Sequence, residues 1–167
     1  MNGFHLPAAF KSLRNSGGNE KSSDSSFAVT VSTSEKSALA TQLGADVVVD
    51  ATSQNLAADM LAANGGKPVD LILEMVGGTT LDASLEILAP FGRLITYGNA
   101  SRTAAKEINP GSLMGGTKTI TGFWLAHCFG NKALLNDVTL INSSFVPGIG
   151  SAISLMVITS GPPKAVN

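Results

Sequence analysis

The chain has 167 residues, 44% of them hydrophobic and 14% charged, and its 11 basic and 12 acidic side chains give a formal net charge of −1. This is the length of one ordinary domain, and the charged share is well below the roughly 25% typical of globular proteins. The balance of charge leaves no basic stripe for a nucleic-acid backbone, and no apolar run is long enough to cross a bilayer. We therefore expect neither a nucleic-acid nor a membrane partner, and a cytoplasmic location.

The N-terminal segment is polar and rich in glycine and serine. We expect residues 1–26 to be flexible, because such a composition buries too little apolar surface to offset the entropy of ordering. The single cysteine, Cys128, excludes an intramolecular disulfide. It stands beside His127, and two adjacent side chains are too few to ligate a metal, so the sequence predicts no metal site and no zinc.

From Phe27 onward, short β-branched segments alternate with segments of helix-forming residues. The predicted strands are residues 27–32, 45–50, 69–76, 92–98 and 117–124. The predicted helices are residues 34–44, 54–63 and 81–90. Ser34 is expected to cap the first helix, and Thr79 or Thr80 the third, since their hydroxyls can accept from the orphan N–H groups of a first turn. Residues 152–159 form a further apolar, β-prone run.

Strands joined through helices of about ten residues require crossover connections, so the sheet is predicted to be mainly parallel with helices on both faces. The fold class is therefore α/β. Beyond Asp137 the alternation fades. The predicted organisation is a flexible segment (1–26), the α/β domain (27–130) and a divergent tail (131–167).

Four segments, in this order and spacing, resemble the cofactor domain of the medium-chain dehydrogenases/reductases. They are VSTSEKSALATQLGADVVVD (31–50), VDLILEMVGG (69–78), LAPFGRLITYGNAS (88–101) and TKTITGFWL (117–125). The region that contains them, residues 27–130, makes up about 100 of the 167 residues. YGNAS without a set of metal ligands is most similar to the zinc-free quinone oxidoreductases. The resemblance implies a Rossmann-like domain whose ligand lies outside the carboxyl ends of the parallel strands.

In the resembled family, the turn after the second strand contacts the adenosine ribose. That turn here carries three hydroxyls, on Ser32, Thr33 and Ser34, followed by Lys36. Hydroxyls and a cation suit a 2′-phosphate, so the resemblance implies NADPH rather than NADH. The alternative is that Ser34 merely caps a helix and Lys36 is a solvated residue of its first turn.

The other motifs correspond to places where the family's backbone approaches the cofactor. The implied cofactor-binding residues are Val76, Gly77, Gly98, Asn99, Ala100 and Phe123. Glycine at such a place lets a ligand come close and permits a positive φ. A simple glycine turn, and a core or interface role for Phe123 and Trp124, are the alternatives. No catalytic residue can be assigned.

The sequence departs from the family at both ends. Residues 1–20 contain no G-x-G-x-x-G, so the sequence predicts that the family's first strand and its glycine-rich phosphate loop are missing. That strand lies in the middle of the family's sheet, and its loss would leave a gap with unpaired edges. We expect residues 152–159 to fill the gap, or the chain to associate through it, which makes a homo-oligomer possible.

Two functions follow. The first is the cofactor domain of an NADPH-dependent oxidoreductase that transfers a hydride to a quinone or an α,β-unsaturated carbonyl compound. The second is a non-catalytic Rossmann-like module with weak or no nucleotide binding, acting through association if at all. The first is the family's function, whereas the second follows from the missing segments, so whether this chain is itself an enzyme stays open.

Overall fold

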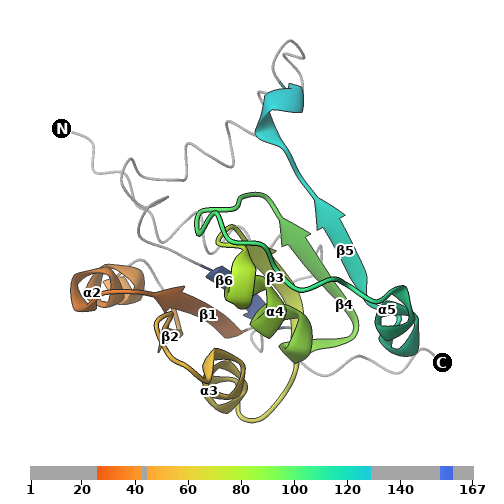
Figure 1. The fold of residues 1–167 in the computed structure, drawn as a ribbon. Coiled ribbons are helices and arrows are strands. Elements are labelled where there is room, and N and C mark those ends of the chain that lie inside the picture. Colours follow the sequence, from red (N-terminus) through yellow and green to blue (C-terminus); the bar gives the residue numbers. More distant parts are fainter. Residues whose placement is uncertain (1–25, 43–44, 129–154, 160–167) are drawn as a thin grey trace.

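The computed structural model describes residues 26–42, 45–128 and 155–159. Figure 1 shows one six-stranded sheet in the order β2-β1-β6-β3-β4-β5. Its strands are β1 (Ser26–Val31), β2 (Val47–Asp50), β3 (Val69–Glu74), β4 (Leu88–Thr96), β5 (Thr119–Gly122) and β6 (Leu155–Thr159). The helices are α2 (Ser34–Gln42), α3 (Leu56–Ala63), α4 (Gly78–Ile87), α5 (Pro110–Gly116) and the 3-10 turn η1 (Leu125–Cys128).

The sheet confirms the predicted α/β class. Strand β1 pairs in parallel with β2, and β4 pairs in parallel with both β3 and β5. Each of β2, β3 and β4 is reached through a helix, as parallel neighbours require. The parallel pair β1 and β2 does not bond directly to the parallel strands β3, β4 and β5, because another strand lies between β1 and β3.

That central strand is β6, from the far end of the chain. Its backbone runs antiparallel to both neighbours, with Val157 opposite Ala28 of β1 and Ile72 of β3. The expectation that residues 152–159 fill the gap in the sheet is thus confirmed for Leu155–Thr159. The strand enters the sheet from the edge where the parallel strands end, since Leu155 pairs with Thr30 and Glu74.

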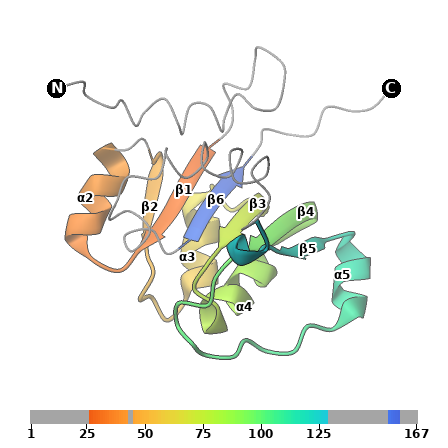
Figure 2. The same ribbon diagram turned by 90° about the horizontal axis from the view of Figure 1, so that it is seen from above.

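The hydrophobic core lies between the sheet and the helices α3 and α4, which pack side by side against it. Val69, Ile72 and Leu94 are fully buried and contact a cluster that includes Met60 of α3 and Ile87 of α4. Helix α2 lies beside β1 and β2, away from α3 and α4 (Figure 2). This packing holds the ends of the strands, and the turns that follow them, in fixed relative positions.

Several predicted boundaries are wrong, and each error has a local cause. Helix α2 is capped by Thr33 rather than Ser34, because the Thr33 carbonyl accepts the first helical bond from Ser37 and its Oγ1 accepts from the N–H of Lys36. Helix α4 begins at Gly78, with Gly77 at the N-cap and no hydroxyl cap. The predicted caps at Thr79 and Thr80 are therefore wrong.

The region from 88 to 124 also differs in detail. The chain is extended already at Leu88, and a register irregularity in the pairing with β3 accompanies a positive φ of 61° at Phe91. Residues Pro110–Gly116, which lie between the predicted strands 92–98 and 117–124, form the short helix α5, which Asn109 caps by accepting from the N–H of Gly111. Strand β5 begins later than predicted because Thr117 is left-handed, with a φ of 50°, and it ends at Gly122 rather than Trp124.

Candidate functional site

The ends of the parallel strands are joined by backbone hydrogen bonds just beyond the regular pairing. The N–H of Ala51 donates to Val31 at 2.8 Å, that of Tyr97 to Glu74 at 2.9 Å, and that of Phe123 to Thr96 at 2.8 Å. The turns that follow β1, β3, β4 and β5 therefore lie along one edge of the sheet. This is the edge at which open α/β sheets bind ligands.

A cavity of about 260 Å³ lies at the end of β1. It is lined by Val31, Ser32, Thr33, Ser34, Ser37 and Asp50. Three of the four residues predicted to contact the ribose are thus brought together. The fourth, Lys36, does not line the cavity, and it is placed in the first turn of α2 with its N–H donating to Thr33 Oγ1 at 3.3 Å.

Asp50 is a member of this cavity that the sequence did not identify. Its Oδ1 accepts from the N–H of Thr52 at 2.8 Å and from the Thr52 hydroxyl at 2.7 Å. These two hydrogen bonds, the backbone one first, hold the pKa of Asp50 below its ordinary value. The sequence did contain a signal for Asp50, which ends a predicted strand and is followed two residues later by a threonine. In a parallel sheet the end of that strand lies beside the end of β1, where ligands bind.

The glycine turn after β3 has a conformation that other residues rarely adopt. Gly77 has a φ of 77° and a ψ of −166°, and Gly78 has a φ of 54°. A Cβ added to Gly77 would overlap Oδ1 of Asn99, which belongs to the loop after β4. Glycine is required here both for the backbone conformation and for the close approach of the second loop.

Two backbone hydrogen bonds join this turn to the loop after β4. The N–H of Ala100 donates to Met75 at 2.9 Å, and that of Ser101 donates to Val76 at 2.8 Å. A Cβ on Gly98 would come within 2.8 Å of the Met75 carbonyl. The predicted residues after β3 and β4 are therefore in contact with one another, as two paired turns.

Glu74 lies at the base of these paired turns and is fully buried. Its Oε1 accepts from the N–H groups of Val76 at 2.6 Å and Gly77 at 2.8 Å. Burial raises the pKa of Glu74, and the N–H groups of Gly77 and Val76, together with the Thr96 side chain, oppose that rise. The pKa of Tyr97 is also raised, first by burial and then by the Glu74 carboxylate.

The remaining predicted residue, Phe123, follows β5 and is 40% exposed, while Trp124 beside it is 61% exposed. Neither is buried in the described part of the chain, so a core role for them is wrong. Phe123 is on the same edge as the turns described above, because its N–H bonds to the carbonyl of Thr96.

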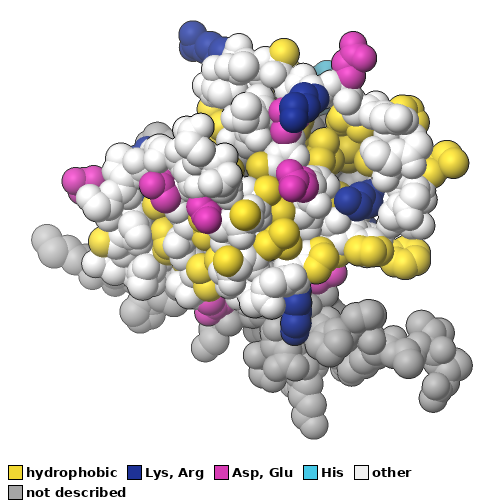
Figure 3. Space-filling model, turned by 60° about the horizontal axis from the view of Figure 1, so that its bottom comes forward, with side chains coloured by type: hydrophobic (Ala, Val, Ile, Leu, Met, Phe, Trp, Pro, Cys, Tyr) yellow, Lys and Arg dark blue, Asp and Glu magenta, His cyan; other side chains and the backbone are white. Residues whose placement is uncertain are grey.

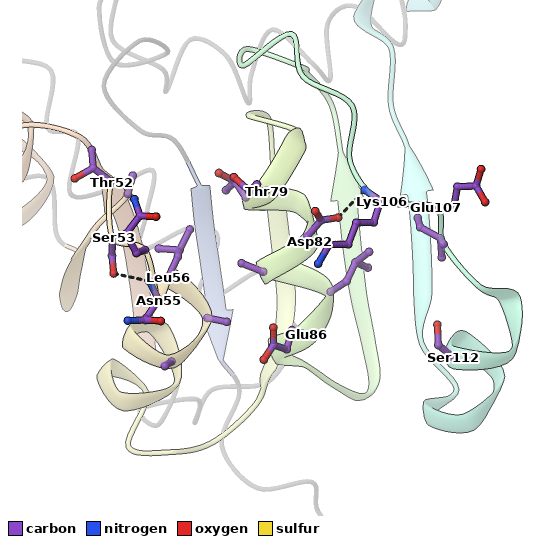
Figure 4. Close-up of a pocket in the computed structure, with 18 of the residues that line it drawn as sticks. Thr52, Ser53, Asn55, Leu56, Thr79, Asp82, Glu86, Lys106, Glu107 and Ser112 are labelled. Carbon is purple, nitrogen blue, oxygen red and sulfur yellow. Dashed lines mark hydrogen bonds between the residues drawn. The ribbon is translucent and has the colours of Figure 1, made fainter.

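A larger cavity, of about 690 Å³, lies on the helical side of the sheet, between α3, α4 and the segment leading into α5. Figure 4 shows Asp82 of α4 facing this segment, where its carboxylate accepts from the N–H of Lys106 at 2.9 Å. None of the predicted cofactor residues lines it. Figure 3 shows acidic and basic side chains interspersed on one face of the molecule.

Two further features concern the described residues alone. No three of their His, Cys, Asp and Glu side chains form a group that could hold a metal ion. None of their helices is both long enough and apolar enough to span a membrane.

The chain is similar to known proteins in sequence and in fold. The family model of the zinc-binding dehydrogenases matches residues 26–141. Quinone oxidoreductase of Pseudomonas aeruginosa is 40% identical over 72 residues, which are 43% of this chain and 22% of that protein. The 2-haloacrylate reductase of a Burkholderia species is 39% identical over 75 residues, which are 45% of this chain and 22% of that protein.

Among solved structures, Escherichia coli quinone oxidoreductase complexed with NADPH matches with a TM-score of 0.59 and 27% identity, covering 75% of this chain and 38% of that one. The chain thus spans about a fifth of the curated relatives and less than half of this structure. The family match covers most of the parallel sheet and every turn described above. The chain therefore belongs to the zinc-binding dehydrogenase family and carries part of its nicotinamide dinucleotide-binding domain, with relatives among the quinone oxidoreductases.

Proposed function

We propose that the chain binds NADPH along the edge formed by the turns after β1, β3, β4 and β5, as the cofactor-binding part of a quinone or enone reductase. The observation that carries the proposal is the pair of turns after β3 and β4. Gly77 lets the Asn99 side chain of the second turn lie directly against its backbone, and this contact keeps the two turns side by side. A dinucleotide needs such close approach to backbone groups.

The binding residues divide between two parts of the ligand. Ser32, Thr33 and Ser34 line the cavity at the end of β1, and their hydroxyls would hold the adenosine ribose and its 2′-phosphate. Lys36 would supply a positive charge from the adjoining helical turn. We propose NADPH because this cavity would suit a 2′-phosphate. The Escherichia coli relative is also complexed with NADPH.

The other part of the ligand, the nicotinamide ribose and ring, would lie against Val76, Gly77, Gly98, Asn99, Ala100 and Phe123. When bound, the cofactor supplies a hydride to an electron-poor acceptor such as a quinone or an α,β-unsaturated carbonyl compound. The protein's own contribution is to bind and orient the ring and to exclude water from one of its faces. Phe123, 40% exposed at the end of β5, offers apolar surface for that purpose.

Two glycine variants test the site by calorimetric titration with NADPH. In Gly77→Ala the new methyl group overlaps Asn99, so we expect the dissociation constant to rise at least about tenfold. Gly65→Ala is the matched control, because Gly65 also has a positive φ, 64°, but has nothing within 4 Å of the added carbon. Equal affinities in the two variants would contradict the proposed site.

A second candidate function is a nucleotide-binding or association module without turnover. It is favoured by β6, an antiparallel strand at the sheet position where the family has the strand leading into its phosphate loop. The helix N-terminus that would follow that strand, and bind the pyrophosphate, has no counterpart among the described residues. NADPH oxidation with a quinone acceptor separates the two: turnover supports the first function, and binding without turnover supports the second.

A further inference from the structure

The carboxylate of Glu74 occupies a place where a charged side chain is costly. It lies at the end of β3, is 0% exposed, and has one oxygen, Oε2, that is buried without a hydrogen-bond partner. Replacing a buried charge by an apolar side chain of similar volume is often neutral or stabilising. Stability of the core therefore does not account for a glutamate at this position.

The other oxygen shows what the carboxylate does. Oε1 accepts from two successive N–H groups, those of Val76 and Gly77, immediately before helix α4 begins at Gly78. The N-cap residue, Gly77, has no side chain to cap the helix. Glu74 thus places a negative charge, from the preceding strand, just before the helix N-terminus, whose dipole favours such a charge.

These two hydrogen bonds fix the orientation of the peptide groups that meet the second turn. The carbonyl of Val76 accepts from Ser101, and that of Met75 accepts from Ala100. Gly77 itself lies in a region of φ and ψ that is almost confined to glycine, so local backbone preference does not hold it there. The carboxylate is the side chain that holds this turn.

We propose that Glu74 is a positioning residue, which acts through Val76 and Gly77 to hold the paired turns of residues 75–78 and 98–101 in the shape that faces the dinucleotide. The ligand in this proposal rests on the proposed function. The effect on the turns is a property of the protein alone and can be measured without any ligand.

Two variants of similar volume separate positioning from packing. Glu74→Met fills the same space but accepts no hydrogen bond, whereas Glu74→Gln keeps a carbonyl acceptor without the charge. In the full chain we would measure thermal unfolding, amide hydrogen exchange and NADPH affinity. For Glu74→Met we expect an unchanged or higher unfolding midpoint, at least about tenfold faster exchange at Val76 and Gly77, and about tenfold weaker NADPH binding.

Glu74→Gln is expected to restore exchange and affinity to within about threefold of wild type. A turn that loosens while the whole protein becomes no less stable is a result that a purely structural role would not give. Protection of Val76 and Gly77 that is unchanged in Glu74→Met would overturn the proposal, as would faster exchange spread equally over β3 and β4. Faster exchange at the turn in a protein that binds no NADPH would support positioning and refute the proposed function.

Discussion

Two charged side chains lie near the end of β1, and they would act in opposite directions on the phosphate proposed to bind there. Lys36 carries a positive charge in the first turn of α2, and Asp50 places a carboxylate in the cavity with the three hydroxyls. The Thr52 hydrogen bonds keep the pKa of Asp50 low, so it is charged at neutral pH. In the proposed site, the preference for NADPH over NADH would therefore depend on how these two charges balance.

Substituting each charge in turn tests that balance. Lys36→Ala is expected to weaken NADPH binding about tenfold, the size of one charge-assisted hydrogen bond, and to leave NADH within about twofold. Asp50→Asn retains an acceptor for Thr52 and is expected to strengthen NADPH binding relative to NADH. Fluorescence titration with each nucleotide checks both variants. Equal changes in the affinities for NADPH and NADH would contradict contact between these side chains and the 2′-phosphate.

Burial of Glu74 makes the stability of the protein depend on pH in a definite direction. Its pKa is raised above the ordinary value of 4.5, so between 4.5 and the raised pKa the folded state binds more protons than the unfolded state. The free energy of unfolding should therefore fall as pH rises through that window. Urea unfolding at stepped pH should show this fall in wild type relative to Glu74→Gln. A constant difference between the two proteins would contradict the raised pKa.

The hydroxyl of Thr30 is a second buried polar group without a partner. Thr30 is 0% exposed, and its Oγ1 makes no hydrogen bond in the described part of the chain. Thr30→Val replaces the hydroxyl by a methyl group of similar size and should raise the free energy of unfolding by about 1 kcal/mol. The control is Thr121→Val on the exposed strand β5, expected within about 0.5 kcal/mol of wild type. Chemical denaturation measures both, and a loss of stability in Thr30→Val would show that the hydroxyl is satisfied.

At the level of elements, β6 determines whether the sheet is continuous. It is hydrogen-bonded on both sides, to β1 and to β3, and these two strands are not paired with each other. Its neighbours at the strand ends, Thr30 and Glu74, carry the two buried polar atoms that lack partners. Strand β6 thus completes the backbone hydrogen bonding at the centre of the sheet, while the Thr30 and Glu74 side chains beside it each keep one polar atom without a partner.

A proline in this strand tests its central place. Val157→Pro removes an N–H in the middle of a strand with partners on both sides, so we expect a loss of about 3 kcal/mol or more, enough to unfold much of the protein. Thr119→Pro, at the first residue of the edge strand β5, should cost clearly less. Circular dichroism during urea unfolding compares them. Equal stability of Val157→Pro and wild type would place β6 outside the sheet.

At the scale of the whole molecule, the sequence predicted the order of strands and helices because the apolar segments of β1, β2 and β3 have the length and composition of buried strands. It also placed Ser32–Ser34, Val76–Gly77 and Gly98–Ala100 at strand ends, which the parallel sheet brings to one edge. The direction of β6 was not predictable, because a short apolar run pairs equally well either way.

The roles proposed for Asp50 and Glu74 were not predicted, for a different reason. Each depends on hydrogen bonds to residues two or three positions ahead, whose N–H groups are oriented only in the folded turn. A glutamate within the apolar run LILEMV was nevertheless a signal, since glutamate is almost never fully buried without partners. Helix α5, with three glycines in seven residues, had too weak a helical propensity to be predicted.

The paired turns and the cavity at the end of β1 are proposed to form one dinucleotide site. The most direct measurement is titration of the full chain with NADPH and, separately, NADH, following nicotinamide fluorescence. We predict saturable binding of NADPH, stronger than that of NADH. A folded protein that binds neither nucleotide at millimolar concentration would contradict the claim, and would leave a family fold without the family's ligand.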